Sequence, residues 1–429
     1  MLTNSSRVTV IGGNLLIRNV RRNDTGMYSC TVENFLRSQT SSAYLTVQVS
    51  PTIHEVLGPS RVQWKQNILF SCKLDGVPTP RVIWFKDMSK IPYTSRIYAR
   101  GSELHIISSG NDDTGNYTCE ASNVVGSTKM TRQLIVEVPP NEPLNLKIRE
   151  ITSTSLQILW HPGFNGYSPI TSYKLEIRRN STPVWSTVSE RIKSENYTVD
   201  YLKPYTVYHL RVLAENKIGW SRPSERVWNR TGEDSPSSPT GLQCQTINSS
   251  TIFLTWNKPS LPNGKLRKYN IQYSNQSNHA DVSTASMTRY IRGLQPFTWY
   301  TFRIQAATGG NPVLLWGNYS SYVSCRSGQA APIDAPRNLM VQSSGPHSIW
   351  ARWQKIPIGS ENGIVIGYYL QYKTPWDVNY TRIFIAGNDT LQYNITGLFP
   401  WTNYTVQIAA ITVALGPWTL LRASETDES

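Results

Sequence analysis

A short stretch of sequence occurs three times in this chain of 429 residues. The copies read LKPYTVYHLRV at 202–212, LQPFTWYTFRI at 294–304 and LFPWTNYTVQI at 398–408. Their first leucines lie 92 and then 104 residues apart. This spacing is the size of a small domain and exceeds the roughly 20 to 50 residues of a solenoid unit. The repeat therefore predicts a series of small domains, each with one copy of the stretch.

Two aromatic anchors precede each copy and recur with it. A tyrosine follows a tryptophan after 13 or 15 residues, in the pairs Trp160 and Tyr173, Trp256 and Tyr269, and Trp353 and Tyr368. These anchors lie in short runs of alternating apolar and polar residues that are bounded by Pro, Gly, Asn or Ser. Such runs are typical of antiparallel β-sandwiches, so the sequence predicts an all-β chain.

Alternation also shows where the tyrosine of the recurring stretch points. In TWYTFRIQA, Tyr300, Phe302 and Ile304 share one face of a strand, which we expect to be the buried one. A buried phenol needs a hydrogen-bond partner, and a tyrosine at this place can bond to backbone a few residues upstream. The stretch is therefore interpreted as a tyrosine corner, which stabilises the fold and performs no chemistry.

Taken together, the anchors resemble the fibronectin type III pattern. Upstream of them, DDTGNYTCEASN resembles the corner of an immunoglobulin domain, with Cys72 and Trp84 in the matching places before it. The resemblance implies a disulfide between Cys72 and Cys119 that joins two sheets and packs on Trp84. It also implies that Arg96 pairs with Asp113 at the base of the sandwich.

The immunoglobulin corner occurs once more, near the start of the chain. NDTGMYSCTVEN supplies Tyr28 and Cys30, but no earlier residue supplies a first cysteine or a tryptophan. We therefore expect residues 1–50 to be the C-terminal half of an immunoglobulin-like domain and the chain to be a fragment. In that half, Cys30 would be unpaired and apolar strand faces would be exposed, which favours aggregation.

Joints rich in proline and serine mark the domain boundaries at EVPPNEP, TGEDSPSSPTG and SGQAAPIDAP. We expect the half domain to be followed by one immunoglobulin-like domain and three type III domains, at 51–139, 140–233, 234–331 and 332–429. The last three are called repeat 1, repeat 2 and repeat 3 below. Because proline stiffens such joints, we expect these tandem β-sandwiches to form a semi-extended rod.

Cysteines and glycosylation motifs both indicate an oxidising compartment. Cys244 and Cys325 fall in the first and last expected strands of repeat 2, as either a disulfide or two separate buried thiols. Asn-x-Ser/Thr occurs 13 times, where about six occurrences are expected by chance from 30 asparagines. One of them, Asn180, is disfavoured by the proline in NSTP. The other candidates are Asn4, Asn23, Asn116, Asn196, Asn229, Asn248, Asn275, Asn318, Asn379, Asn388, Asn394 and Asn403.

Repeat 2 is the most basic domain and carries +6 of the net charge of +14, with eight Lys and Arg residues against two Asp residues. Its segment KLRK is predicted to place Lys265 and Arg267 on one face of a strand and Lys268 on the other. A basic surface outside the cell attracts sulfated glycosaminoglycan or an acidic partner. The alternative is a solvated, charged edge that prevents strand pairing. No nucleic-acid-binding motif accompanies these charges.

The sequence shows no catalytic or cofactor motif. Its six histidines form no pair at metal-ligand spacing, and it has no Cys-x-x-Cys, Gly-x-Ser-x-Gly or phosphate-binding glycine loop. It also has no secretory signal and no run of about 18 apolar residues. We therefore expect no enzyme activity, metal, cofactor, nucleic-acid partner or membrane segment in this chain.

Immunoglobulin-like domains followed directly by type III domains resemble the Sidekick, Dscam and contactin class of adhesion molecules. The ectodomains of LAR-type receptor tyrosine phosphatases and of some receptor tyrosine kinases are similar. The resemblance implies an extracellular, glycosylated receptor region at the plasma membrane that binds other cell-surface or matrix proteins, or a second copy of itself. The alternative of another class is an intracellular structural protein of the titin or twitchin type, where glycosylation motifs and cysteine pairs would have no role.

Overall fold

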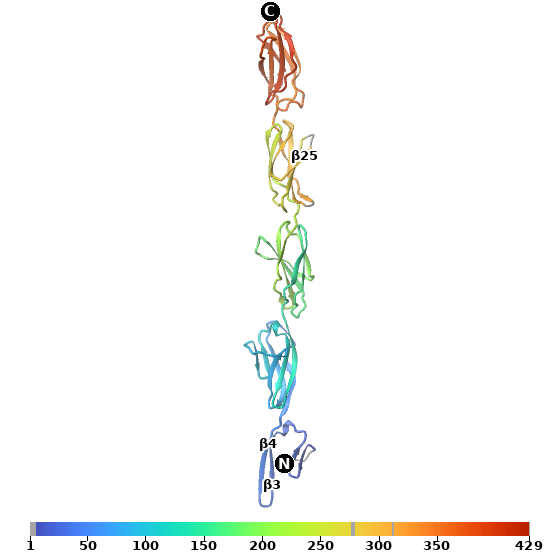
Figure 1. The fold of residues 1–429 in the computed structure, drawn as a ribbon, viewed down its shortest axis with the longest axis vertical. Coiled ribbons are helices and arrows are strands. Elements are labelled where there is room, and N and C mark those ends of the chain that lie inside the picture. Colours follow the sequence, from blue (N-terminus) through green and yellow to red (C-terminus); the bar gives the residue numbers. More distant parts are fainter. Residues whose placement is uncertain (1–5, 276–278, 311–312, 429) are drawn as a thin grey trace. The chain divides into compact units, whose positions relative to one another are not determined.

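The computed structural model of the chain describes residues 6–275, 279–310 and 313–428. Nearly all regular structure in this described part is β-strand, and helix is limited to two single turns, η1 (Arg22–Asp24) and η2 (Asn111–Asp113) (Figure 1). The prediction of an all-β chain is confirmed. The chain divides into two compact units, which are described in turn: residues 1–201 with 207–230, and residues 202–206 with 231–429.

In the first unit, the immunoglobulin-like domain is a sandwich of two sheets. One sheet has the strand order β10-β11-β7-β5 and the other β6-β13-β12-β8-β9. Their core holds Trp84, which is fully buried and lies opposite Cys119 in the register of β8 and β12. The strands are β5 (Val49–Leu57), β6 (Arg61–Gln63), β7 (Ile68–Val77), β8 (Arg81–Lys86), β9 (Ser89–Lys90), β10 (Ile97–Arg100), β11 (Glu103–Ile106), β12 (Gly115–Ser122) and β13 (Ser127–Glu137).

The described residues before this domain repeat its second half at a constant offset. β1 (Val8–Ile11), β2 (Asn14–Ile17), β3 (Gly26–Glu33) and β4 (Ser38–Leu45) each begin 89 residues before β10, β11, β12 and β13. β1 pairs with β2 and β3 with β4, and no third described strand joins either pair (Figure 1). Apolar side chains are therefore exposed on both hairpins, among them Val10, Ile11, Leu15, Leu16, Met27, Val32 and Tyr44.

Repeat 1 completes the first unit as a three-stranded sheet, β14-β15-β18, packed on a larger sheet, β17-β16-β19-β20, in which β21 also pairs with β19. Trp160 and Tyr173 meet edge to face in its core, with ring centroids 5.3 Å apart. The strands are β14 (Leu144–Ile151), β15 (Leu156–His161), β16 (Ser172–Arg179), β17 (Ser186–Ile192), β18 (Asn196–Val199), β19 (Val207–Asn216), β20 (Gly219–Trp220) and β21 (Val227–Arg230).

In the second unit, repeat 2 has the same two sheets, β22-β23-β26 and β25-β24-β27-β28, with β29 pairing with β27. Alternation along β27 is as expected, because Tyr300, Phe302 and Ile304 are buried while Trp299 is exposed. The strands are β22 (Thr240–Asn248), β23 (Thr251–Asn257), β24 (Lys268–Ser274), β25 (His279–Thr284), β26 (Thr288–Arg292), β27 (Trp299–Gly309), β28 (Leu314–Trp316) and β29 (Val323–Arg326).

Repeat 3 follows the same plan, with sheets β30-β31-β34 and β33-β32-β35-β36. Trp353 and Tyr368 pack edge to face in its core, 5.4 Å apart. The strands are β30 (Arg337–Gly345), β31 (Ser348–Gln354), β32 (Gly367–Lys373), β33 (Thr381–Ala386), β34 (Gln392–Thr396), β35 (Asn403–Ile411) and β36 (Arg422–Glu425).

The recurring stretch forms the turn into β27 and β35, and its tyrosine bonds to backbone as predicted. The Tyr300 hydroxyl accepts a hydrogen bond from the N–H of Gln295, at 2.9 Å. Tyr404 accepts one from the N–H of Phe399, at 3.0 Å. These bonds satisfy buried phenols and hold the turn against the strand that follows it.

The aromatic residue after the proline has a second task. Tyr205, Phe297 and Trp401 have φ angles of 49°, 51° and 45°, a left-handed conformation that is uncommon for bulky side chains. In this conformation each donates its N–H to a carbonyl just past the last strand of its repeat, the acceptors being Gly232, Gly328 and Asp427. The turn is thereby tied to the segment that leaves the domain.

A buried hydroxyl closes the corner from that departing segment. In repeat 2, Ser327 Oγ accepts a hydrogen bond from the N–H of Thr298 at 2.9 Å and donates one to the carbonyl of Gln295 at 2.5 Å. Thr231 and Thr426 do the same in the other two repeats. Sequence analysis missed this residue, although a Ser or Thr directly after the last strand recurs in all three repeats.

Candidate recognition surfaces

The site residues expected from the sequence are cysteines, glycosylation asparagines and basic side chains. In the part of the chain that the structure describes, no group of three or more His, Cys, Asp or Glu residues is arranged to hold a metal ion. No helix there is long and apolar enough to cross a membrane. The expected residues are placed one group at a time below.

The structure contains two disulfides. Cys72 on β7 is bonded to Cys119 on β12, which joins the two sheets of the immunoglobulin-like domain. Cys244 on β22 is bonded to Cys325 on β29, which joins the two sheets of repeat 2. Cys30 on β3 is a free, exposed thiol. The two bonds therefore tie sheet to sheet in two different kinds of domain.

The expected ion pair at the base of the immunoglobulin-like domain is confirmed. Arg96 donates two hydrogen bonds to the Asp113 carboxylate, at 2.7 and 2.8 Å, and this raises the pKa of Arg96. The Tyr117 hydroxyl donates to the Asp113 carbonyl at 2.9 Å, and burial raises the pKa of Tyr117. The same pair, which was not predicted, occurs in the segment before this domain, where Arg7 holds the pKa of Asp24 at about 2.

Asparagines of the glycosylation motifs are accessible wherever the structure describes them. Asn116 and Asn403 are exposed on β12 and β35 while their neighbours Tyr117 and Tyr404 are buried, as alternation predicts. None of the other motif asparagines is buried, and Asn4 lies outside the described residues. Attachment of glycans would therefore require no unfolding at any described motif.

The basic segment of repeat 2 is bound to a carboxylate. Contrary to the prediction, Lys265 and Arg267 precede the strand, because β24 begins at Lys268. The N–H of Lys265 donates to Glu233 Oε1 at 2.9 Å instead of to a strand neighbour, and Arg267 Nε donates to the Gly309 carbonyl at 3.0 Å. Glu233 also accepts from the Gly309 N–H at 2.7 Å, so this carboxylate lies beside the patch and is bound by backbone.

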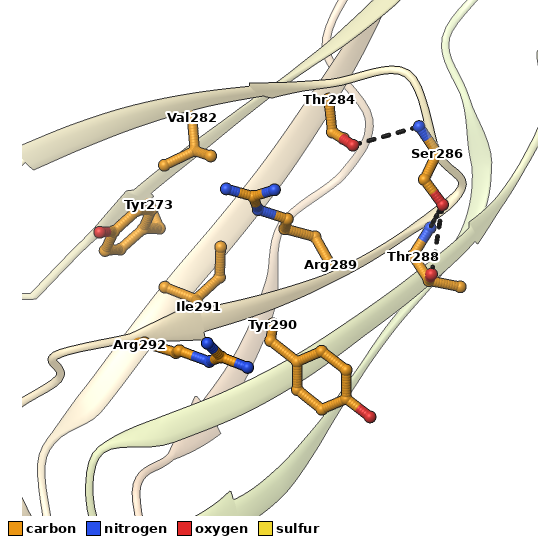
Figure 2. Close-up of a pocket in the computed structure, with 9 residues that line it drawn as sticks. All are labelled: Tyr273, Val282, Thr284, Ser286, Thr288, Arg289, Tyr290, Ile291 and Arg292. Carbon is orange, nitrogen blue, oxygen red and sulfur yellow. Dashed lines mark hydrogen bonds between the residues drawn. The ribbon is translucent and has the colours of Figure 1, made fainter.

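A second basic feature of repeat 2 is a hollow of about 510 Å³ between the edges of its two sheets. β25 and β26 are the edge strands, and the hollow lies at the open side of the sandwich between them (Figure 2). We call it the edge hollow; its lining residues are Tyr273, Val282, Thr284, Ser286, Thr288, Arg289, Tyr290, Ile291 and Arg292.

Arg289 enters the edge hollow from the core-facing side of β26. In the register of β23 and β26, Arg289 is opposite Leu254 and Ile291 is opposite Ile252, and both β23 residues are fully buried. Figure 2 shows the Arg289 side chain extending toward Val282 on β25. The guanidinium therefore lies on the side of β26 where alternation predicts an apolar side chain that packs on the core.

Comparison with known proteins defines the domain types. The fibronectin type III domain family matches residues 141–229, 237–314 and 334–421. The immunoglobulin I-set domain family matches residues 51–136.

Three curated relatives are similar over almost the whole of this chain. Tyrosine-protein phosphatase Lar of Drosophila melanogaster is 29% identical over 94% of the chain. Neogenin of Homo sapiens is 28% identical over 98%, and cell adhesion molecule DSCAM of Gallus gallus is 29% identical over 94%. The chain spans only 20%, 30% and 21% of the length of these relatives, respectively.

A solved structure titled as the FN1-FN3 domains of chicken CNTN1 is also similar. It covers 68% of this chain at 21% identity with a TM-score of 0.36, and all of that structure is matched. From the family matches, which cover more than half of the residues, the chain belongs to the fibronectin type III family, with an immunoglobulin I-set domain preceding its three type III domains.

Proposed function

We propose that this chain is part of the extracellular region of a cell-surface adhesion or recognition receptor, and that it binds other proteins without catalysing a reaction. The observation that carries the proposal is the extent of the matches. The relatives, one of which is a cell adhesion molecule, match 94% to 98% of the chain. They therefore share with this chain the order of several domains and not one domain alone.

The glycosylation motifs support the extracellular placement. A secreted β-sandwich needs its glycan acceptors on the surface, and the described motif asparagines are all exposed or half-exposed. The disulfides Cys72–Cys119 and Cys244–Cys325 also belong to an oxidising compartment. An intracellular scaffold of the titin or twitchin type would gain nothing from either feature.

Binding to intact cells tests this function. The full chain, made multivalent on beads, should bind cells that carry a partner, and binding should be lost when their surface proteins are digested. Beads should also cluster with one another if the partner is a second copy of the chain. Absence of both protease-sensitive cell binding and bead clustering would contradict the proposal.

Sulfated glycosaminoglycan is a second candidate partner, and the net charge of +6 on repeat 2 favours it. The same assay separates it from a protein partner. Binding that is lost after enzymatic digestion of cell-surface heparan sulfate would assign the interaction to the glycan. Binding that survives this digestion and is lost only after protease digestion would assign it to a protein.

Whether the parent protein carries a catalytic domain is a separate matter. The relative from Drosophila melanogaster is named a tyrosine-protein phosphatase, and this chain matches 20% of it. We propose that the parent is either a receptor phosphatase or kinase, or an adhesion molecule without a catalytic domain. In each case the segment described above would serve recognition.

A further inference from the structure

The edge hollow exists because repeat 2 departs from the other repeats at one position. Tyr197 on β18 is opposite Ile158, Arg289 on β26 is opposite Leu254, and Tyr393 on β34 is opposite Ala351. These three positions are equivalent, since each β15, β23 or β31 partner lies two residues before the buried tryptophan of its repeat.

A tyrosine at this position covers the open side of the sandwich. Tyr197 and Tyr393 are half-buried, and Tyr393 packs against the core of repeat 3. Arg289 is exposed and has no part in the core of repeat 2. The substitution therefore replaces an apolar cover with a cation at the wall of a hollow.

Among the described residues, no carboxylate pairs with the charge in the edge hollow. None of its nine lining residues is acidic, and no ion pair of the described residues involves Arg289 or Arg292. The guanidinium of Arg292 lies over the ring of Tyr290, 5.9 Å from its centroid. Arg292 and Tyr290 thus share the face of β26 opposite Arg289. The forked donor that remains available to an anion in the hollow is that of Arg289, and carboxylate or sulfate oxygens match its geometry.

The remaining lining suits a sugar. Thr284, Ser286 and Thr288 bring hydroxyl groups to one end of the hollow, where they already bond to one another and to nearby backbone. The ring of Tyr273 provides an apolar surface, fixed by stacking on Phe302 with centroids 5.8 Å apart. A volume of about 510 Å³ falls in the range of small-ligand sites.

We propose that the edge hollow of repeat 2 binds an anionic saccharide unit, whose sulfate or carboxylate group is held by Arg289. The site differs from the patch of Lys265, Arg267 and Lys268, because none of these three residues lines the hollow. This inference rests on the proposed extracellular role, because such saccharides occur on cell surfaces and in the matrix. Purified components test it, so its result does not depend on the binding of cells.

The test measures binding of a fluorescent heparin-derived tetrasaccharide to the full chain by anisotropy, after enzymatic removal of the chain's own N-glycans. A desulfated tetrasaccharide with the same carboxylates forms the second arm. If the sulfated tetrasaccharide binds and the desulfated one does not, sulfate is the bound group. If the two tetrasaccharides bind with equal affinity, carboxylate is the bound group. Both results support the proposal, while absence of binding in both arms would overturn it.

Variants locate the site. Arg289→Tyr introduces the residue that repeats 1 and 3 carry, so it should preserve the fold while reducing affinity about tenfold or more. Arg292→Gln, an exposed position on the opposite face of β26, is a matched control that should change affinity by less than about threefold. A second control, Lys265→Gln/Lys268→Gln, removes two charges outside the hollow and should reduce affinity by less than about threefold. An equal or larger effect of either control would overturn the site and indicate diffuse attraction to charge.

Discussion

Corner tyrosines make opposite hydrogen bonds in the two domain types. Tyr117 donates to the carbonyl of Asp113, four residues upstream, whereas Tyr300 accepts from the N–H of Gln295, five residues upstream. A buried phenol is satisfied by either bond, which is why the sequence predicts a bond to backbone. Whether the phenol donates or accepts depends on the path of the turn before it. This is a 3-10 turn in the immunoglobulin-like domain and a turn with the left-handed residue Phe297 in repeat 2.

Ser327→Ala should weaken the corner of repeat 2. The change leaves the N–H of Thr298 and the carbonyl of Gln295 without their hydroxyl partner, at an expected cost of about 1 to 3 kcal/mol in the free energy of unfolding. Hydrogen exchange of the full chain should be faster for residues 294–304. Ser324→Ala, at an exposed position of β29, is the control; equal protection in both variants would show that the bonds do not hold the turn.

Glu137 should make the stability of the first unit depend on pH. Its buried carboxylate accepts from Lys217 at 2.8 Å and Arg61 at 2.7 Å, and these partners, Lys217 foremost, lower its pKa. The ionised form is therefore the stabilising one: its contribution is present above the unfolded pKa, near 4.5, and is lost as the pH falls through the lower native pKa.

The measurement compares the unmodified chain with Glu137→Gln in acid and neutral solution. The unmodified chain should be the more stable at pH 7, and the difference should shrink as the pH falls below about 4.5. A difference that is constant with pH would contradict a role for the charge. Glu142→Gln, at an exposed position nearby, should leave the pH dependence unchanged.

At the scale of strands, the alternation of apolar and polar residues correctly predicted which face of a strand is buried. The inward side of β27 followed from alternation. The constant offset of 89 residues between β1 to β4 and β10 to β13 could have revealed Arg7 as the counterpart of Arg96. The start of β24 was mispredicted because Glu233, distant in sequence, binds the N–H of Lys265. The edge hollow could not be predicted without the pairing of β23 with β26, which shows that Arg289 faces the core side.

The disulfide between β22 and β29 should stabilise repeat 2 alone. Val341 and Ser424 occupy the places of repeat 3 that correspond to Cys244 and Cys325. The variant Cys244→Val/Cys325→Ser therefore gives repeat 2 the same two residue types as repeat 3. Because the bond closes a loop of 81 residues, its loss should cost about 2 to 4 kcal/mol.

Hydrogen exchange of the full chain resolves the effect by domain. The double variant should exchange faster throughout β24 and β27, with β32 and β35 of repeat 3 unchanged as an internal control. Unaltered protection of β24 and β27 would show that the two sheets of repeat 2 hold together without the bond.

For the whole molecule, the order of domains was predictable because each type carries its own anchors: a tryptophan, a tyrosine and the recurring stretch in the repeats, and a cysteine pair in the immunoglobulin-like domain. The choice of partner was not predictable, since it depends on surface residues that the fold leaves free to vary. The semi-extended rod stays a prediction from the proline-rich joints. At this scale we propose that the chain faces an oxidising, glycosylating compartment.

The most direct test of that claim is the chemical state of the endogenous protein. Peptide mapping with thiol labelling and enzymatic removal of N-glycans reports the state of each cysteine and each motif asparagine in one experiment. We expect intact Cys72–Cys119 and Cys244–Cys325 bonds, with glycans on several of the accessible asparagines. Reduced cysteines on a protein without glycans would contradict it and would place the chain among intracellular scaffolds.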